Sequence, residues 1–253
     1  MIVPCIDLQG GRAVQLIQGR RPALAVEDVL GLLDKFHKFP VMHVIDLDAA
    51  MGTGGNARLI KRLCNAGKMK IRVGGGIRTA ARAEKMLSWG AEKVIVGSAA
   101  FREGDVDDRF LGGLRERVGK KRVIVAIDTR AGKILVRGWK EKLALRPEEV
   151  IARLEPYCSE FLATYVDNEG TMRGTNLRWF RKLRQCTKLP ITAAGGIRSM
   201  AEVRALEKMG MNAAVGMALY TGKLRGFGDV RSNDALGGVR RSGAEIPRRR
   251  KNA

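Results

Sequence analysis

Two aspartates occupy corresponding places in the two halves of the chain. Asp7 ends the apolar run IVPCID, and Asp128 ends the run RVIVAID. A carboxyl group that emerges from an apolar wall is poorly solvated, and a second carboxyl nearby moves the two pKa values apart. One group could then act as a base while the other acts as an acid. A single aspartate more often caps a turn or pairs with an arginine, so this interpretation depends on the correspondence between the halves.

Two sets of glycine turns could bind phosphate. Glycine lets an anion approach the backbone N–H groups, and the dipole of a following helix favours negative charge. The sets recur at matching offsets, which predicts a long substrate with a phosphate at each end that reacts in the middle. The residues are Gly75, Gly76, Gly97 and Ser98 in the first half, and Gly195, Gly196, Gly216 and Met217 in the second.

A few other polar or aromatic side chains are weaker candidates. Thr164, in the run FLATYV, could hydrogen-bond the reacting centre or be an ordinary strand residue. Trp139, in the loop RGWKEK, could stack on a heteroaromatic ring or serve as a packing anchor. His37 falls in a helical pattern and His43 opens a strand, so neither is expected to be catalytic. Because no His, Cys or carboxylate cluster has metal-ligand spacing, we predict no metal and no cofactor.

The elements that would position these residues alternate regularly. Short β-branched runs are separated by amphipathic stretches, a pattern typical of βα units around a parallel sheet. The predicted strands are 2–7, 42–47, 70–74, 93–97, 122–128, 161–166, 190–194 and 212–216. The clearest helical patterns are 26–39, 79–90, 147–157 and 199–210. Eight such units predict an α/β fold, the (β/α)8 TIM barrel, in which catalytic groups lie at the C-terminal ends of strands.

An internal repeat strengthens this prediction. The segment GGIRTAARAEKMLSWGAEKVIVGSAAF, which starts at Gly75, aligns with GGIRSMAEVRALEKMGMNAAVGMALY, which starts at Gly195. We therefore expect a barrel of two similar half-barrels, with the matched strands diametrically opposed. The two aspartates would then face each other across one cavity.

The C-terminal segment breaks the pattern. We expect the barrel to span 1–224 and the basic, Gly- and Arg-rich tail 225–253 to be disordered, because it has no helical periodicity. The eighth helix is accordingly predicted to be missing or very short.

The net charge is +21, from 47 Lys and Arg against 26 Asp and Glu. Outside the tail this charge is spread along the chain, and aromatic residues make up only 5%. These features favour a basic surface that attracts a phosphorylated small molecule over nucleic-acid binding. The four cysteines form no CxxC pair, and the sequence pattern predicts neither a signal peptide nor a membrane-spanning run. We expect a cytoplasmic monomer with no membrane partner.

Taken together, several motifs resemble one enzyme family. The segments IVPCIDLQGGRAVQL, HVIDLDAA, VGGGIR, VIVGSAAF, AIDTRAGKILVRGW, TYVDNEGTMRGTN, AAGGIR and VGMALY are similar to those of the phosphoribosylformimino aminoimidazole carboxamide ribotide isomerases of histidine biosynthesis. The resemblance covers about 1–224. It implies a (β/α)8 barrel, no cofactor, and an Amadori rearrangement of an aminoaldose with two phosphates to an aminoketose. It further implies that Asp7 is the general base, that Asp128 is the general acid, and that Thr164 helps to hold the reacting ribose.

Some features depart from the family pattern or leave alternatives open. The family often has arginine where this chain has Gln15 and Met217, and the loop QGRRPALAVED after the first strand looks short. The alternatives are the sister barrel, a cyclase that forms imidazole glycerol phosphate with ammonia, and a dual-substrate isomerase that also accepts a tryptophan-pathway anthranilate. A barrel recruited to bind polyanions is the non-enzymatic alternative.

Overall fold

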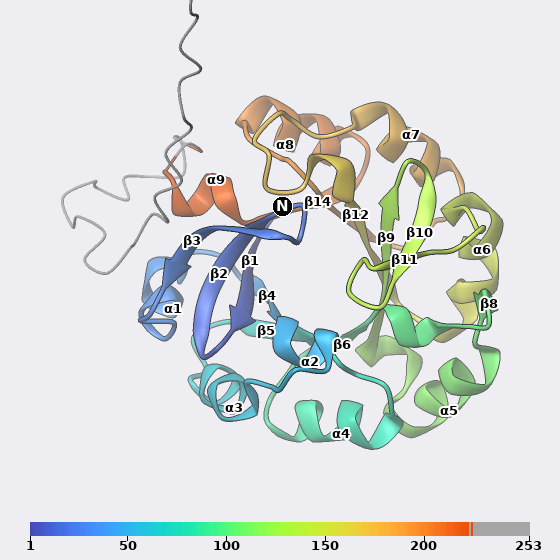
Figure 1. The fold of residues 1–253 in the computed structure, drawn as a ribbon, viewed down its shortest axis with the longest axis horizontal. Helices are drawn as coiled ribbons and strands as arrows, with labels where there is room; N and C mark the ends of the chain where they lie inside the picture. The colour runs from blue at the N-terminus through green and yellow to red at the C-terminus, as the bar shows by residue number, and fades with distance from the viewer. Residues whose placement is uncertain (223, 225–253) are drawn as a thin grey trace, which may run out of the picture.

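The computed structural model describes residues 1–222 and 224, and the predicted tail 225–253 lies outside this range. Eight parallel strands pair in chain order, and pairings of β6 with β9 and of β14 with β1 close the ring (Figure 1). The strands are β1 Ile2–Gln9, β4 Val41–Asp46, β5 Lys70–Gly74, β6 Lys93–Val96, β9 Val123–Arg130, β12 Glu160–Tyr165, β13 Ile191–Ala194 and β14 Met211–Val215. The predicted (β/α)8 barrel is confirmed.

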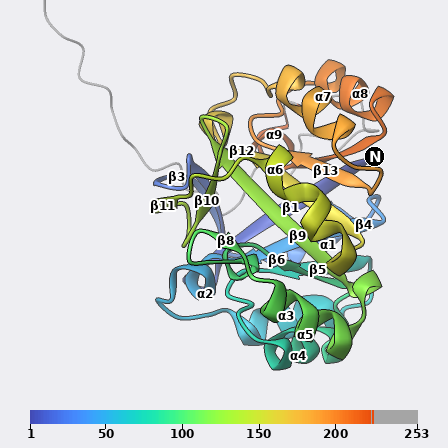
Figure 2. The same ribbon diagram turned by 90° about the vertical axis from the view of Figure 1, so that its right-hand side faces the viewer.

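Helices surround the strands, as Figures 1 and 2 show from two sides. They are α1 Gly31–Lys35, α2 Leu47–Met51, α3 Ala57–Asn65, α4 Ala80–Ser88, α5 Asp108–Val118, α6 Pro147–Leu154, α7 Leu177–Gln185, α8 Met200–Lys208 and α9 Met217–Tyr220. The repeated GGIR segments each lead into a helix whose hydroxyl N-cap, Thr79 or Ser199, accepts a backbone N–H. The helix that follows β14 within the described residues, α9, has four residues.

The prediction was wrong after the first strand. The segment between β1 and α1 is a hairpin of β2, Arg12–Ile17, and β3, Arg21–Val26, rather than a short loop. Within the predicted helix 26–39, the α-helix is limited to α1, which begins at Gly31. The Asp28 carboxylate accepts the backbone N–H of Gly31 at 2.9 Å. β2 pairs with both β1 and β3, so pairing with the barrel determines the structure of this segment, and the hairpin takes Val26 from the predicted helix.

A second hairpin follows the corresponding strand of the other half. It is formed by β10, Lys133–Val136, and β11, Glu141–Lys142, and β10 pairs antiparallel to β9. Each predicted catalytic strand therefore continues into an antiparallel hairpin, and both hairpins lie at one end of the barrel (Figure 2).

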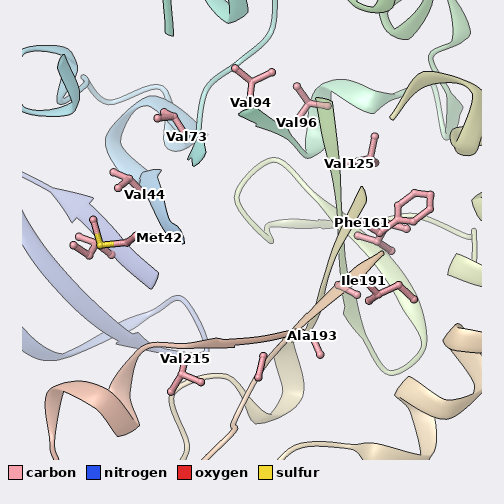
Figure 3. Packing of buried hydrophobic residues seen from close by; sticks show 14 of the residues in the cluster. Met42, Val44, Val73, Val94, Val96, Val125, Phe161, Ile191, Ala193 and Val215 are labelled. Atoms are coloured by element: carbon pink, nitrogen blue, oxygen red, sulfur yellow. The ribbon is translucent and has the colours of Figure 1, made fainter. Parts of the chain in front are cut away.

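Two apolar layers hold the barrel together. The outer layer fills the space between strands and helices, and Figure 3 shows side chains such as Val44, Val96 and Phe161 pointing away from the ring of strands. Alternate residues face the interior, where a smaller cluster is formed by Ile95, Ile124, Leu162 and Ala214.

A buried charged layer lies closer to the N-terminal ends of the strands. Arg72 contacts Glu160 at 2.9 Å, and Lys93 lies 3.4 Å from the same carboxylate. His43, which is fully buried there, has its pKa lowered to about 3 by burial and by the charges of Arg72 and Lys93. His43 is therefore neutral at physiological pH.

Candidate active site

A cavity of about 220 Å³ opens at the C-terminal ends of the strands. Its floor includes the inward residues Ile95, Leu162 and Ala214, so a substrate would rest on the apolar interior of the barrel. Most residues predicted from the sequence line it, namely Asp7, Gly75, Gly76, Gly97, Ser98, Asp128, Trp139, Thr164 and Gly216. The other three, Gly195, Gly196 and Met217, line a neighbouring pocket of about 20 Å³ that shares Gly216. Catalytic and binding candidates thus gather at one mouth.

Asp7 projects into the cavity from β1. It lies beside Ile45 of β4 and Val14 of β2 in the strand register, which fixes its backbone from both sides. The Cys5 thiol, two residues earlier on the same face, donates to Asp7 Oδ1 at 3.8 Å. Burial raises the pKa of Asp7 to about 7, the charge of Asp128 adds to this rise, and the Cys5 hydrogen bond opposes it.

Asp128 projects into the same cavity from β9. The indole Nε1 of Trp139 donates to Asp128 Oδ2 at 2.8 Å, and Thr164 lies beside Asp128 in the register of β12 and β9. Burial raises the pKa of Asp128, while hydrogen bonds from Thr164 and Trp139 lower it. Asp128 therefore has two donors that stabilise its ionised form, whereas Asp7 has a single weak one.

Trp139 packs against the other hairpin. Its ring is partly buried and contacts Gly19, where a Cβ would lie 2.5 Å from the ring carbon Cε3. Gly19 has a φ of +69° at the turn between β2 and β3. The two hairpins therefore meet over the mouth of the cavity through this contact.

Glu169 is a third carboxyl group in the cavity, which sequence reasoning missed. It follows the 3-10 turn Val166–Asn168 after β12. Burial raises the pKa of Glu169 to about 8, and the charges of Asp7 and Asp128 add to the rise. Glu169 lies in an irregular loop rather than at a strand end, so the rule used for the aspartates did not select it. The signal was the acidic residue in the quoted motif TYVDNEGTMRGTN.

The glycines of the two sets have different structural roles. Gly75 has a φ of +94°, and a Cβ on it would lie 2.2 Å from the carbonyl oxygen of Asp46. Gly195 has a φ of +108°, and a Cβ on it would lie 2.4 Å from the carbonyl oxygen of Tyr165. Both are required for close packing against the end of the neighbouring strand, β4 or β12. At Gly97 the nearest atom is 3.7 Å away, the Cβ of Ala126, so its backbone is open to the cavity.

The first set has a cationic neighbour in the cavity wall. Arg78 lines the cavity and donates to the carbonyl oxygens of Ala49 and Ala50 at 3.0 and 2.7 Å. The Ser98 hydroxyl accepts the backbone N–H of Arg137 at 2.7 Å, which ties this set to the second hairpin. Among residues 1–222 and 224, no group of three His, Cys, Asp or Glu residues could hold a metal ion.

Comparison with known proteins decides the family. Residues 1–225 match the model of the family described as "Histidine biosynthesis protein". The chain belongs to this family. Its curated relatives include the 1-(5-phosphoribosyl)-5-((5-phosphoribosylamino)methylideneamino)imidazole-4-carboxamide isomerases of Methanocaldococcus jannaschii, at 36% identity, and Myxococcus xanthus, at 37% identity. Each match covers 88% of this chain and 94% of the relative.

These matches confirm the expected isomerase of histidine biosynthesis, an aldose–ketose isomerase. They extend over the whole barrel, both halves included. In the part of the chain that the structure describes, no helix is long and apolar enough to cross a membrane.

Proposed function

We propose that this isomerase converts the aminoaldose named in its relatives, which has two phosphoribosyl groups, into the corresponding aminoketose by acid–base catalysis with Asp7 and Asp128. The observation that supports this most strongly is their arrangement. Two carboxyl groups occupy matched positions on opposed strands of one barrel, line one cavity, and interact electrostatically. We also propose that the enzyme works in the cytoplasm as a monomer.

The rearrangement needs one acid and one base. In this proposal Asp128 gives a proton to the ring oxygen of the reacting ribose, so that the C1–O bond breaks and an open-chain iminium forms. Asp7 then removes the proton from C2, and the resulting enolamine takes up a proton at C1 as the C2 hydroxyl becomes a ketone. Hydrogen moves from C2 to C1 with no net oxidation. Thr164, adjacent to Asp128, would hold the ribose.

Protonation states bear on these roles. A base with a pKa of about 7 is substantially ionised at neutral pH, which suits Asp7. The Trp139 N–H favours ionised Asp128, so we propose that Trp139 leaves this carboxylate when substrate enters and stacks on the imidazole ring instead. Glu169, with a pKa of about 8, keeps its proton at neutral pH and limits the negative charge that the substrate meets.

The two glycine sets would hold the two phosphates. Gly75, Gly76, Gly97 and Ser98 form the first phosphate cradle; Gly195, Gly196, Gly216 and Met217 form the second. Their positions on opposite halves would stretch the substrate across the cavity, with the reacting ribose near the aspartates.

A parallel turnover assay tests the proposal. The purified protein would be given the histidine-pathway aminoaldose, the anthranilate analogue of the tryptophan pathway, and the cyclase substrate with ammonia. We expect conversion of the aminoaldose alone. Conversion of the analogue as well would make the enzyme bifunctional, and failure to convert the aminoaldose would contradict the proposal.

A further inference from the structure

Gln15 is a buried polar residue of β2 that lines the active-site cavity. Only 2% of it is exposed. Its Oε1 and Nε2 lie 2.4 and 2.8 Å from the position that a Cβ on Gly216 would take. The amide of Gln15 therefore rests on the backbone of Gly216, at the edge of the second phosphate cradle. The corresponding glycine of the first cradle, Gly97, has no side chain over it closer than 3.7 Å.

Within residues 1–222 and 224, neither polar atom of the Gln15 amide makes a hydrogen bond to another residue. A primary amide has two N–H donors and a carbonyl acceptor, and those of Gln15 are not among the buried polar atoms that lack a partner, so they can be reached from the cavity. Rotation of the amide by 180° places Nε2 where Oε1 lies without disturbing the packing. A ligand that enters the cavity can therefore take a hydrogen bond from Gln15.

The hairpin holds Gln15 firmly in this place. Leu16 follows Gln15 in β2, and its carbonyl oxygen packs against Gly170. A Cβ on Gly170 would lie 2.2 Å from this oxygen. The Gln18 backbone N–H donates to the Glu169 carbonyl at 3.0 Å, and its side chain donates to the Asp167 carbonyl at 2.8 Å. The hairpin is thus fastened to the loop after β12, on the same side as the second cradle.

Among residues 1–222 and 224, no lysine or arginine lines the pocket of the second cradle. This pocket is lined by Glu169, by apolar residues and by glycines. Arg198, which corresponds to Arg78 in the repeat, reaches the carbonyl oxygen of Met172 at 3.4 Å and lines neither pocket. The first cradle, in contrast, has Arg78 in its wall. Among the described residues, the side-chain donor that lies against this cradle is therefore the neutral amide of Gln15.

We infer that Gln15 donates a hydrogen bond from Nε2 to a phosphate oxygen at the second cradle, and that this end of the cavity is a neutral and weaker phosphate site than the first. The inference rests on the proposed bisphosphorylated substrate. Two phosphate sites of unequal affinity would favour one orientation of a substrate that has a phosphate at each end.

Titration calorimetry with ribose 5-phosphate, which resembles one end of the substrate, tests this inference without turnover. We expect the wild type to bind at two sites of unequal affinity, and Gln15→Met to weaken the weaker site by roughly tenfold to a hundredfold, as loss of a hydrogen bond to a charged group requires. Gln9→Met is the matched control, because Gln9 ends β1 outside both pockets. Unchanged binding at both sites in Gln15→Met would overturn the inference.

Kinetics with the aminoaldose give the second readout. KM should rise roughly tenfold in Gln15→Met while kcat stays within about threefold, because the contact is made to a remote phosphate in ground and transition states alike. Should Gln15→Met fail to fold, Gln15→Glu keeps the shape and replaces the donor with an acceptor; affinity equal to the wild type would then refute the donor role. A wild type that binds ribose 5-phosphate but does not convert the aminoaldose would contradict the proposed function and leave the Gln15 test intact.

Discussion

The strands that carry Asp7 and Asp128 are nearly identical in backbone structure, but they give the two carboxyl groups different chemical environments. β1 and β9 each have eight residues, share one alternating burial pattern, and continue into an antiparallel hairpin. Asp7 meets a thiol at 3.8 Å, whereas Asp128 meets an indole N–H at 2.8 Å and the neighbouring Thr164. The repeat therefore places two equal carboxyl groups, and side chains outside the repeated pattern make them unequal. This difference is what would allow one fold to supply both a base and an acid.

Removing either carboxylate should have the largest effect. We expect Asp7→Asn and Asp128→Asn each to lower kcat by about 10²- to 10⁴-fold, the usual contribution of a general acid or base. Steady-state assays give kcat, and calorimetry with substrate checks that binding persists. Turnover near that of the wild type in either variant would refute the role assigned to that residue.

Glu169→Gln should have a smaller effect at neutral pH, because amide and protonated carboxyl are both uncharged and alike in shape. We expect kcat at pH 7 to remain within about tenfold of the wild type, and the loss of activity above pH 8, where Glu169 ionises, to diminish. The pH dependence of kcat/KM checks this. A loss of a hundredfold or more at pH 7 would move the acid role from Asp128 to Glu169.

Trp139→Phe would remove the N–H that favours ionised Asp128 and keep an aromatic ring. In the Glu169→Gln background, where Glu169 no longer titrates, we expect the pKa of Asp128 to rise, so that the basic limb of kcat/KM moves to higher pH, with a change in kcat/KM of less than about tenfold at pH 7. A basic limb that stays in place in this background would show that Asp128 is not the acid. Gly19, which the ring contacts, offers no polar substitute for the missing donor.

Cys5→Ala should have the smallest effect. The thiol stabilises ionised Asp7 weakly, so its loss should raise the pKa of Asp7 and move the acidic limb of kcat/KM to higher pH, by less than about one unit. Cys5→Ser, which restores a donor, should move it back. A serine variant that behaves like the alanine variant would mean that Cys5 acts through packing alone.

The sequence predicted what repeats and missed what is irregular. Asp7, Asp128 and the glycine turns were found because strand ends and matched offsets are visible in the chain. The β2–β3 hairpin was missed because its strands are stable only when paired with β1, which a local pattern does not report. Glu169 was missed for a related reason, since a loop anchored on that hairpin brings it to the aspartates. The contact of Trp139 with Asp128 likewise depends on two hairpins that meet in space.

The pH dependence of kcat/KM in the wild type, beside that of Asp7→Asn, tests the central claim most directly. We expect kcat/KM to rise with pH through about 7, as Asp7 loses its proton. We expect it to fall above about 8, as Glu169 loses its proton. The residual activity of Asp7→Asn should lack the rise near pH 7. A flat wild-type profile, or the same rise in the variant, would contradict catalysis by these carboxyl groups.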